Sequence, residues 1–198
     1  VGLSASSYLD PGSLGCIGVG TAFGVAASLA YPGRQVIVAT GDGAFGFMSL
    51  SGAANSFIWN NVSGHAFYGI NLNPAAAHSV NYNNVFSNAL IGVYLNSSAN
   101  NNSLTGNYMS ANGTAGLALG NGAYSNVLAQ NWSFANNLHG TWIFSASNNN
   151  SFSSHFSGLN SAGHAGLFIS ASSSNTFTDL TVEGSTAVFI TGSTGTVI

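Results

Sequence analysis

The chain has 198 residues, of which 45% are hydrophobic, so it is long and apolar enough for one or two domains with a buried core. Only 3% of its residues are charged, against about 25% in typical soluble domains, and the net charge is -3. Because Arg34 is the single basic residue, the chain cannot neutralise a run of phosphates, which argues against nucleic acid and an anionic membrane surface as partners.

The first fifty residues predict a helix followed by a strand. The uncharged stretch Leu14–Ala30 is at the short limit for a membrane span and rich in glycine, so we favour a buried globular helix there. A Pro-Gly turn and the apolar strand Gln35–Thr40 follow and lead into Gly41, Asp42 and Gly43.

This order of elements resembles the cofactor-binding module of thiamine diphosphate enzymes, most of all the acetolactate synthase and 2-hydroxyacyl-CoA lyase group, over residues 8–47. The resemblance implies that Asp42 is a Mg²⁺ ligand and that Gly41 and Gly43 let the backbone approach the diphosphate. It also implies a second, Asn ligand further along, and Asn71 stands in that position.

The rest of the thiamine diphosphate module is missing from this sequence. The acidic helix and buried strand that should come next do not follow Phe47, and the partner domain that activates the cofactor is absent. We therefore expect no cofactor, neither thiamine diphosphate nor Mg²⁺, to bind this chain. A fragment of a thiamine diphosphate- and Mg-dependent lyase or decarboxylase, which would be cytoplasmic, is the second hypothesis.

From residue 51 onward the sequence repeats with a period of roughly 24 residues. One register is a glycine or alanine followed by alternating apolar residues, at Gly69, Gly92, Gly116, Gly140, Gly166 and Ala187. A second, in phase with it, comprises Phe57, Val80, Leu104, Val127, Phe152 and Phe177. An antiparallel sandwich needs no such fixed period, so residues 51–198 predict an all-β fold, a right-handed parallel β-helix of about six coils.

Three positions after each residue of the second register lies a side chain, polar in all coils but the last, that is expected to stack between coils. Equivalent positions of successive coils lie about 4.8 Å apart, so side-chain amides can hydrogen-bond along the stack as a ladder. The expected ladder contains Asn60, Asn83 and Asn107, continues with Gln130, and loses its amides at His155 and Leu180.

The repeat resembles the β-helices of the pectate-lyase-like superfamily and of surface β-helix proteins. Enzymes of that superfamily act on polysaccharides with clustered carboxylates, or with carboxylate-bound Ca²⁺ and a basic residue. In residues 51–198 the carboxylates are Asp179 and Glu183, with no Lys or Arg beside them. We interpret the two as solubilising surface charges rather than a catalytic pair.

Two further groups of side chains are candidates for binding. His139 and His164 lie about one coil apart with His155 between them, but a zinc or copper site needs further convergent ligands, so ladder or surface histidines are the preferred interpretation. Aromatic rings with amide neighbours are typical of sugar recognition, although the same rings could simply stack between coils. The candidates are Tyr94, Tyr108, Trp132 and Trp142.

These observations predict a non-catalytic, extracytoplasmic β-helix protein with a structural or carbohydrate-binding role. Its partner would be a polysaccharide or other glycan, and it would lie outside the cell or at the cell surface. Residues 1–50 have a second interpretation that needs no cofactor, since an amphipathic helix often closes the N-terminal end of a β-helix. The sequence leaves open whether residues 1–50 are such a cap or a separate thiamine diphosphate-enzyme-like segment.

Overall fold

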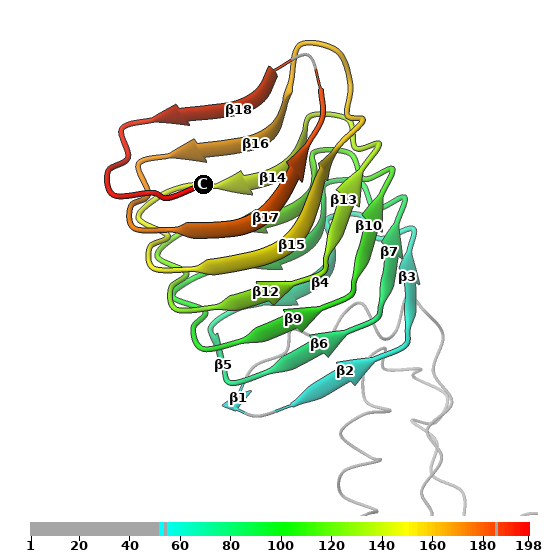
Figure 1. The fold of residues 1–198 in the computed structure, drawn as a ribbon. Coiled ribbons are helices and arrows are strands. Elements are labelled where there is room, and N and C mark those ends of the chain that lie inside the picture. The colour runs from blue at the N-terminus through cyan, green and yellow to red at the C-terminus, as the bar shows by residue number, and fades with distance from the viewer. Residues whose placement is uncertain (1–51, 54, 185) are drawn as a thin grey trace, which may run out of the picture. The chain divides into compact units, whose positions relative to one another are not determined.

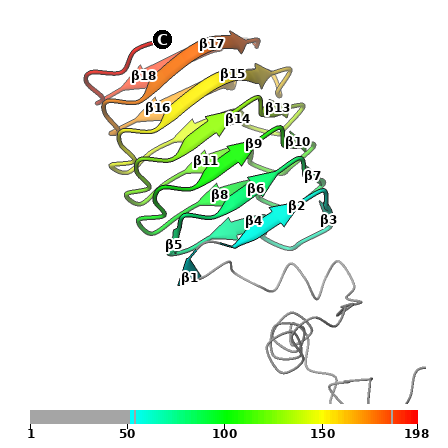
Figure 2. The ribbon, with the colours of Figure 1, turned by 60° about the horizontal axis from the view of Figure 1, so that its bottom comes forward.

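The computed structural model describes residues 52–53, 55–184 and 186–198, which form a parallel β-helix of about six coils. The chain divides between residues 48 and 49, and the described residues all belong to the second unit. Successive coils lie one above another along the helix axis, from β2 to β17 (Figures 1 and 2). The fold predicted from the two sequence registers is confirmed. The expected helix, the strand at 35–40 and the proposed N-terminal cap lie outside the described residues.

Each coil contributes strands to three faces, and every strand pairing is parallel. The first face comprises β2 (Ser56–Ile58), β6 (Ser79–Asn81), β9 (Ser103–Thr105), β12 (Val127–Ala129) and the first halves of β15 (Ser151–Gly158) and β17 (Thr176–Val182). The second comprises β3 (Asn61–Ser63), β7 (Asn84–Phe86), β10 (Tyr108–Ser110), β13 (Trp132–Phe134) and the second halves of β15 and β17. The third comprises β4 (Tyr68–Leu72), β8 (Ile91–Leu95), β11 (Ala115–Leu119), β14 (His139–Ile143), β16 (Ala165–Ser170) and β18 (Thr186–Thr191). Two short strands, β1 (Gly52–Ala53) and β5 (Ala75–Ala76), pair separately.

The core of the first face is a row of inward side chains, one from each coil, and the expected row is wrong at one position. Leu128, fully buried, pairs with Leu104 and Phe152, whereas Val127 is 53% exposed and pairs with Ser103. Both residues are apolar, and alternation along a strand places only one of them inside. The row is Phe57, Val80, Leu104, Leu128, Phe152 and Phe177.

The glycine register of the third face is confirmed, and its cause is close packing. Gly92 lies on β8, and a Cβ built there would come within 2.7 Å of the Nδ2 of Asn112 from the next coil. A Cβ at Gly69 would meet the Nδ2 of Asn88 at 2.8 Å. The glycines therefore leave room for amide side chains that turn inward at the corner before this face.

Three asparagine ladders run along the β-helix, one at each corner between two faces, whereas the sequence predicted a single ladder. The first corner joins the first and second faces, the second joins the second and third faces, and the third leads from the third face to the next coil. Asn107 shows the pattern, since its backbone N and its Nδ2 both donate to Oδ1 of Asn131, at 3.0 and 2.9 Å. Its Nδ2 also donates to the carbonyl oxygen of Val80, at 2.8 Å. The ladders comprise Asn60, Asn83, Asn107 and Asn131 at the first corner, Asn88, Asn112, Asn136 and Asn160 at the second, and Asn102, Asn126, Asn150 and Asn175 at the third.

The expected ladder was therefore correct for its first three members and one residue off in the fourth coil. Gln130 is exposed and has a positive φ of 54°, and the next residue, Asn131, takes the ladder position. The error has the same origin as that at Val127, because both positions were counted from the same misplaced register. Asn83 donates to Asn107 as predicted.

Candidate functional site

Three aromatic side chains form a stack on the solvent side of the second face. Tyr108 on β10, Trp132 on β13 and Phe156 on β15 are direct strand partners. The ring centroids of Tyr108 and Trp132 lie 5.6 Å apart with the planes 5° from parallel, and those of Trp132 and Phe156 lie 4.9 Å apart. Because alternation along each strand turns these side chains outward, the stack belongs to the surface and not to the core.

The rings of this stack overlap only in part. Parallel rings touch at about 3.5 to 4 Å, so the 5.6 Å separation of Tyr108 and Trp132 requires a lateral offset of about 4 Å. Each ring therefore leaves part of its face uncovered, which agrees with exposed fractions of 44% for Tyr108 and 41% for Trp132. Partly uncovered aromatic faces beside polar groups are surfaces on which the C–H face of a sugar ring can pack.

A second exposed pair lies at the first corner, which joins the first and second faces. Trp59 and Tyr82 stack with centroids 4.7 Å apart and are 76% and 44% exposed. Both have positive φ values, 61° and 55°, as do the equivalent corner residues Gly106, Gln130 and Ser154. Each of these residues, with its left-handed backbone, directly precedes an inward-pointing ladder position in the sequence. Sequence reasoning missed this pair because a ring at a turn follows no strand alternation.

The other two predicted sugar-binding residues, Tyr94 and Trp142, lie on a different face. Both are on the outer side of the third face, where Phe144 stacks on each of them, at 6.2 Å from Tyr94 and 4.3 Å from Trp142. Tyr94 is only 5% exposed and packs with Tyr68 at 5.1 Å. The structure therefore brings Tyr108 and Trp132 together, and separately joins Tyr94 and Trp142 through Phe144.

Burial defines the chemistry of Tyr94. Desolvation, assisted by the neighbouring Tyr68, raises the pKa of Tyr94 to about 12. Its hydroxyl accepts a hydrogen bond from Nδ2 of Asn121 at 3.2 Å. The phenol therefore stays protonated near neutral pH and does not act as a phenolate base.

The three candidate histidines do not converge. The rings of His139 and His164 lie 5.5 Å apart, as their one-coil spacing predicted, and burial, with a smaller effect of His164, lowers the pKa of His139. His155 is fully inside the coil, with Nε2 2.8 Å from Oγ1 of Thr141 and Nδ1 without a partner among the residues that the structure describes. Burial lowers the pKa of His155 to about 4. Across the described part of the chain, no three His, Cys, Asp or Glu side chains are grouped to hold a metal ion.

The two carboxylates expected to be surface charges are both exposed. Asp179 lies at the first corner of the last coil and accepts a hydrogen bond from Oγ of Ser154 at 2.9 Å. Glu183 follows β17.

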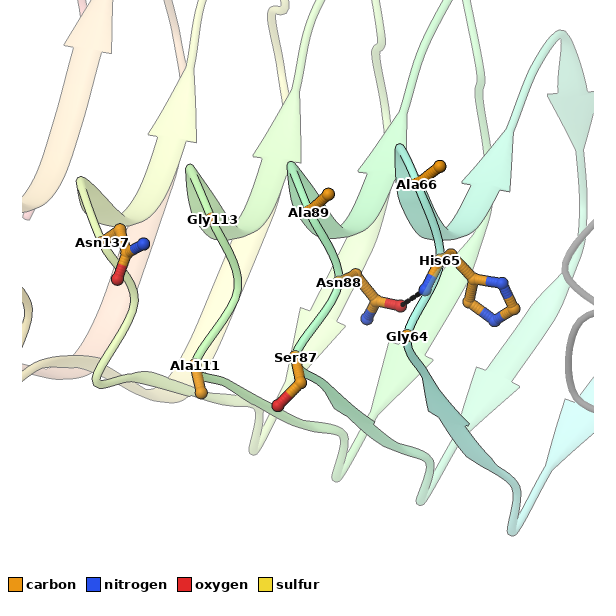
Figure 3. A pocket seen from close by; sticks show the side chains of 9 residues that line it. All are labelled: Gly64, His65, Ala66, Ser87, Asn88, Ala89, Ala111, Gly113 and Asn137. Carbon is orange, nitrogen blue, oxygen red and sulfur yellow. Dashed lines mark hydrogen bonds between the residues drawn. The ribbon is translucent and has the colours of Figure 1, made fainter.

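A shallow hollow runs across the second corner, between the second and third faces. It is bounded mostly by backbone and small side chains, among them Gly64, Ala89 and Gly113. Figure 3 shows the corner loops of four successive coils side by side, with Oδ1 of Asn88 accepting from the backbone N of His65 at 3.2 Å. The Asn88 side chain is held in the second-corner ladder, and the polar side chains of His65, Ser87 and Asn137 also border the hollow.

The residues implied by the thiamine diphosphate resemblance are only partly within the described structure. Gly41, Asp42 and Gly43 lie outside the described residues. Asn71 lies on β4, where it pairs with Tyr94 of the next coil, and its Oδ1 is buried without a partner among the described residues.

The fold defines the chain as a parallel β-helix protein. Residues 46–198 match the family model described as the right handed beta helix region, so the chain belongs to that family. Residues 3–61 match a second model, the C-terminal TPP binding domain of thiamine pyrophosphate enzymes. Both resemblances stated from the sequence are thereby confirmed.

Two curated relatives match a short N-terminal segment of this chain. A probable acetolactate synthase of Mycobacterium bovis is 51% identical over 43 residues, which is 22% of this chain and 8% of that protein. The 2-hydroxyacyl-CoA lyase 1 of Dictyostelium discoideum is 46% identical over 44 residues, again 22% of this chain and 8% of the relative. The chain thus spans a small fraction of the length of these relatives.

Similar solved structures share the β-helix. The periplasmic alginate epimerase AlgG superposes with a TM-score of 0.62 and 13% identity, over 73% of this chain and 45% of that one. The A-module of the mannuronan C-5 epimerase AlgE4 from Azotobacter vinelandii gives 0.64 and 13%, over 70% and 39%. At these identities the likeness establishes the fold alone. Among the described residues, no helix has the length and apolar character needed to cross a membrane.

Proposed function

We propose that this β-helix binds carbohydrate, without catalysis, through the stack of Tyr108, Trp132 and Phe156. The observation that carries the proposal is a row of partly uncovered rings on consecutive coils, held rigid by direct strand pairing. Rigid rings lose little conformational entropy when a ligand packs on them.

The comparisons support a polysaccharide as the partner. The similar solved structures include an alginate epimerase and a mannuronan epimerase module, whose names both refer to polysaccharides. One of these neighbours is described as periplasmic, which agrees with our proposal that this protein works outside the cytoplasm. The low charge and the abundance of Asn and Ser suit a surface that meets sugar hydroxyls.

The test is the binding of the purified chain to a panel of soluble polysaccharides by affinity gel electrophoresis. Trp132→Ala should weaken binding about tenfold, which corresponds to about 1.4 kcal/mol. Phe67→Ala is the matched control, because Phe67 is also an exposed ring but lies away from the stack. Equal losses in both variants, or no binding to any glycan, would refute the proposal.

The second candidate function is that of a fragment of a thiamine diphosphate-dependent lyase or decarboxylase. The match of residues 3–61 to the thiamine pyrophosphate domain favours it, together with the 51% identity to an acetolactate synthase. It predicts that thiamine diphosphate with Mg²⁺ binds through Asp42, and titration calorimetry distinguishes it from the first proposal.

A further inference from the structure

We infer that the ligand is a linear, uncharged polysaccharide that lies along the β-helix axis and contacts five successive coils. This inference rests on the proposed function and names its substrate class. The contact surface, here called the aromatic track, comprises Trp59, Tyr82, Tyr108, Trp132 and Phe156, one residue from each of coils one to five.

The aromatic track is continuous although its rings come from two different positions within the coil. In coils one and two the ring is at the first corner, and in coils three to five it lies two residues later, on the second face. Gly106 is the corner residue of coil three, and a Cβ there would lie 2.6 Å from Cδ1 of Tyr82. The Tyr82 ring thus leans over Gly106, two residues from Tyr108, and bridges the change. A ligand that follows the rings must therefore run from coil to coil, perpendicular to the strands.

Neutral hydrogen-bonding side chains accompany the rings. In the two coils whose ring is at the corner, an exposed asparagine lies two residues after the ring: Asn61 after Trp59, and Asn84 after Tyr82. The Nδ2 of Asn84 lies 3.3 Å from the Oδ1 of Asn61. Where the ring is on the face, the corner position carries Gln130 or Ser154 in coils four and five. Amides and hydroxyls beside aromatic faces match the alternating C–H faces and hydroxyl edges of a sugar chain.

Charge argues against polyuronates such as alginate and mannuronan, after which the structural neighbours are named. The described residues contain no Lys or Arg, so none of them places a fixed cation beside the aromatic track. The nearest carboxylate in the corner row is Asp179, in coil six, which would repel an anionic chain at that end. A polymer with a carboxylate on every sugar would lose hydration without gaining ion pairs, so a neutral chain is preferred.

An interface between two copies of this chain is the other use of exposed rings. Beside the aromatic track, Phe134 packs edge-on against Tyr108 with the ring centroids 5.9 Å apart, while Asn, Gln and Ser occupy the other positions next to the rings at the corner. The exposed rings therefore form a strip that follows the coils, whereas stable protein interfaces bury a broad apolar centre. A long strip with polar side chains at the corner fits a single extended sugar chain better than a second protein surface.

The test compares neutral linear oligosaccharides of increasing length, from glucan, mannan and xylan, with oligomers of polygalacturonate and alginate. Binding is followed by calorimetry and Trp fluorescence. We expect a neutral series to bind at least tenfold more tightly than both uronate series, with affinity that rises with length. Tyr82→Asn, chosen because Asn tolerates the left-handed backbone, should weaken long oligomers several-fold and leave the shortest ones that bind unchanged. Trp132→Ala should weaken all of them.

The outcomes separate the inference from the proposed function. Two outcomes would overturn the inference of a neutral ligand along the aromatic track while leaving carbohydrate binding in place. One is tighter binding of the uronate oligomers than of the neutral ones. The other is an affinity for long oligomers that Trp132→Ala reduces but Tyr82→Asn does not. Absence of binding to every glycan would overturn both. If the wild type forms a dimer in sedimentation analysis and Trp132→Ala abolishes that dimer, the surface serves self-association, and both the inference and the proposed function are overturned.

Discussion

Removal of one amide from the middle of the first-corner ladder is the sharpest test of what holds the coils together. Asn107 is fully buried, and its Oδ1 accepts hydrogen bonds from both the backbone N and Nδ2 of Asn83, each at 3.0 Å. Its Nδ2 donates to Val80 and to Asn131. In Asn107→Ala the backbone N–H of Asn83 loses its acceptor inside the coil, while Nδ2 of Asn83 keeps its bond to Phe57.

The expected magnitude follows from these bonds. The buried backbone N–H of Asn83, left without a partner, costs about 1 to 3 kcal/mol. Each side-chain hydrogen bond lost with the Asn107 amide costs a net of about 0.5 to 1.5 kcal/mol. We expect Asn107→Ala to lower the free energy of unfolding by about 2 to 4 kcal/mol, measured by urea denaturation followed by circular dichroism. Asn137→Ala is the control, because Asn137 is exposed at a corner and should change stability by less than about 0.5 kcal/mol. Equal urea midpoints for the two variants would refute the ladder as a source of stability.

Three further predictions follow from the register, from the buried histidine and from the N-terminal segment. Leu104→Asp places an unpaired charge between coils and should abolish soluble folding, whereas Val127→Asp, at an exposed position, should fold. If Val127→Asp also failed to fold, the register expected from the sequence would be restored. The pKa of His155 is lowered to about 4 in the folded protein, below its unfolded value of about 6.5, so the unfolded chain binds the proton more readily. The free energy of unfolding should therefore fall by up to about 3 kcal/mol as the pH drops from 6.5 to 4. His155→Asn should flatten most of this decline in the urea midpoint, and an unchanged pH profile would contradict the assignment. The chain should show no calorimetric binding of thiamine diphosphate with Mg²⁺ below about 1 mM, that is, weaker than about -4 kcal/mol; saturable binding that Asp42→Ala removes would favour the lyase hypothesis.

The sequence by itself determined the fold and most of its internal register. A fixed period with two phase-locked apolar rows permits one architecture, because only stacked coils place every repeat of a row against the next. The glycine row and the contact of Asn83 with Asn107 followed from counting along the chain. Counting failed where two neighbouring residues were equally suitable, as at Val127 and Leu128, since only strand pairing decides which of two apolar residues points inward.

Only the tertiary structure decided which side chains share a surface. Spacing gives the position of a residue within its coil, but at each corner a residue with positive φ reverses the alternation that assigns side chains to inside or outside. The two further asparagine ladders, at the second and third corners, were missed for this reason. The same reversal separates Tyr108 and Trp132, on the second face, from Tyr94 and Trp142, on the third, although all four are equally plausible sugar-binding residues in the sequence. Trp59 and Tyr82 join the surface of the first pair because the left-handed corner turns their side chains outward, which no pattern of strand residues could have shown.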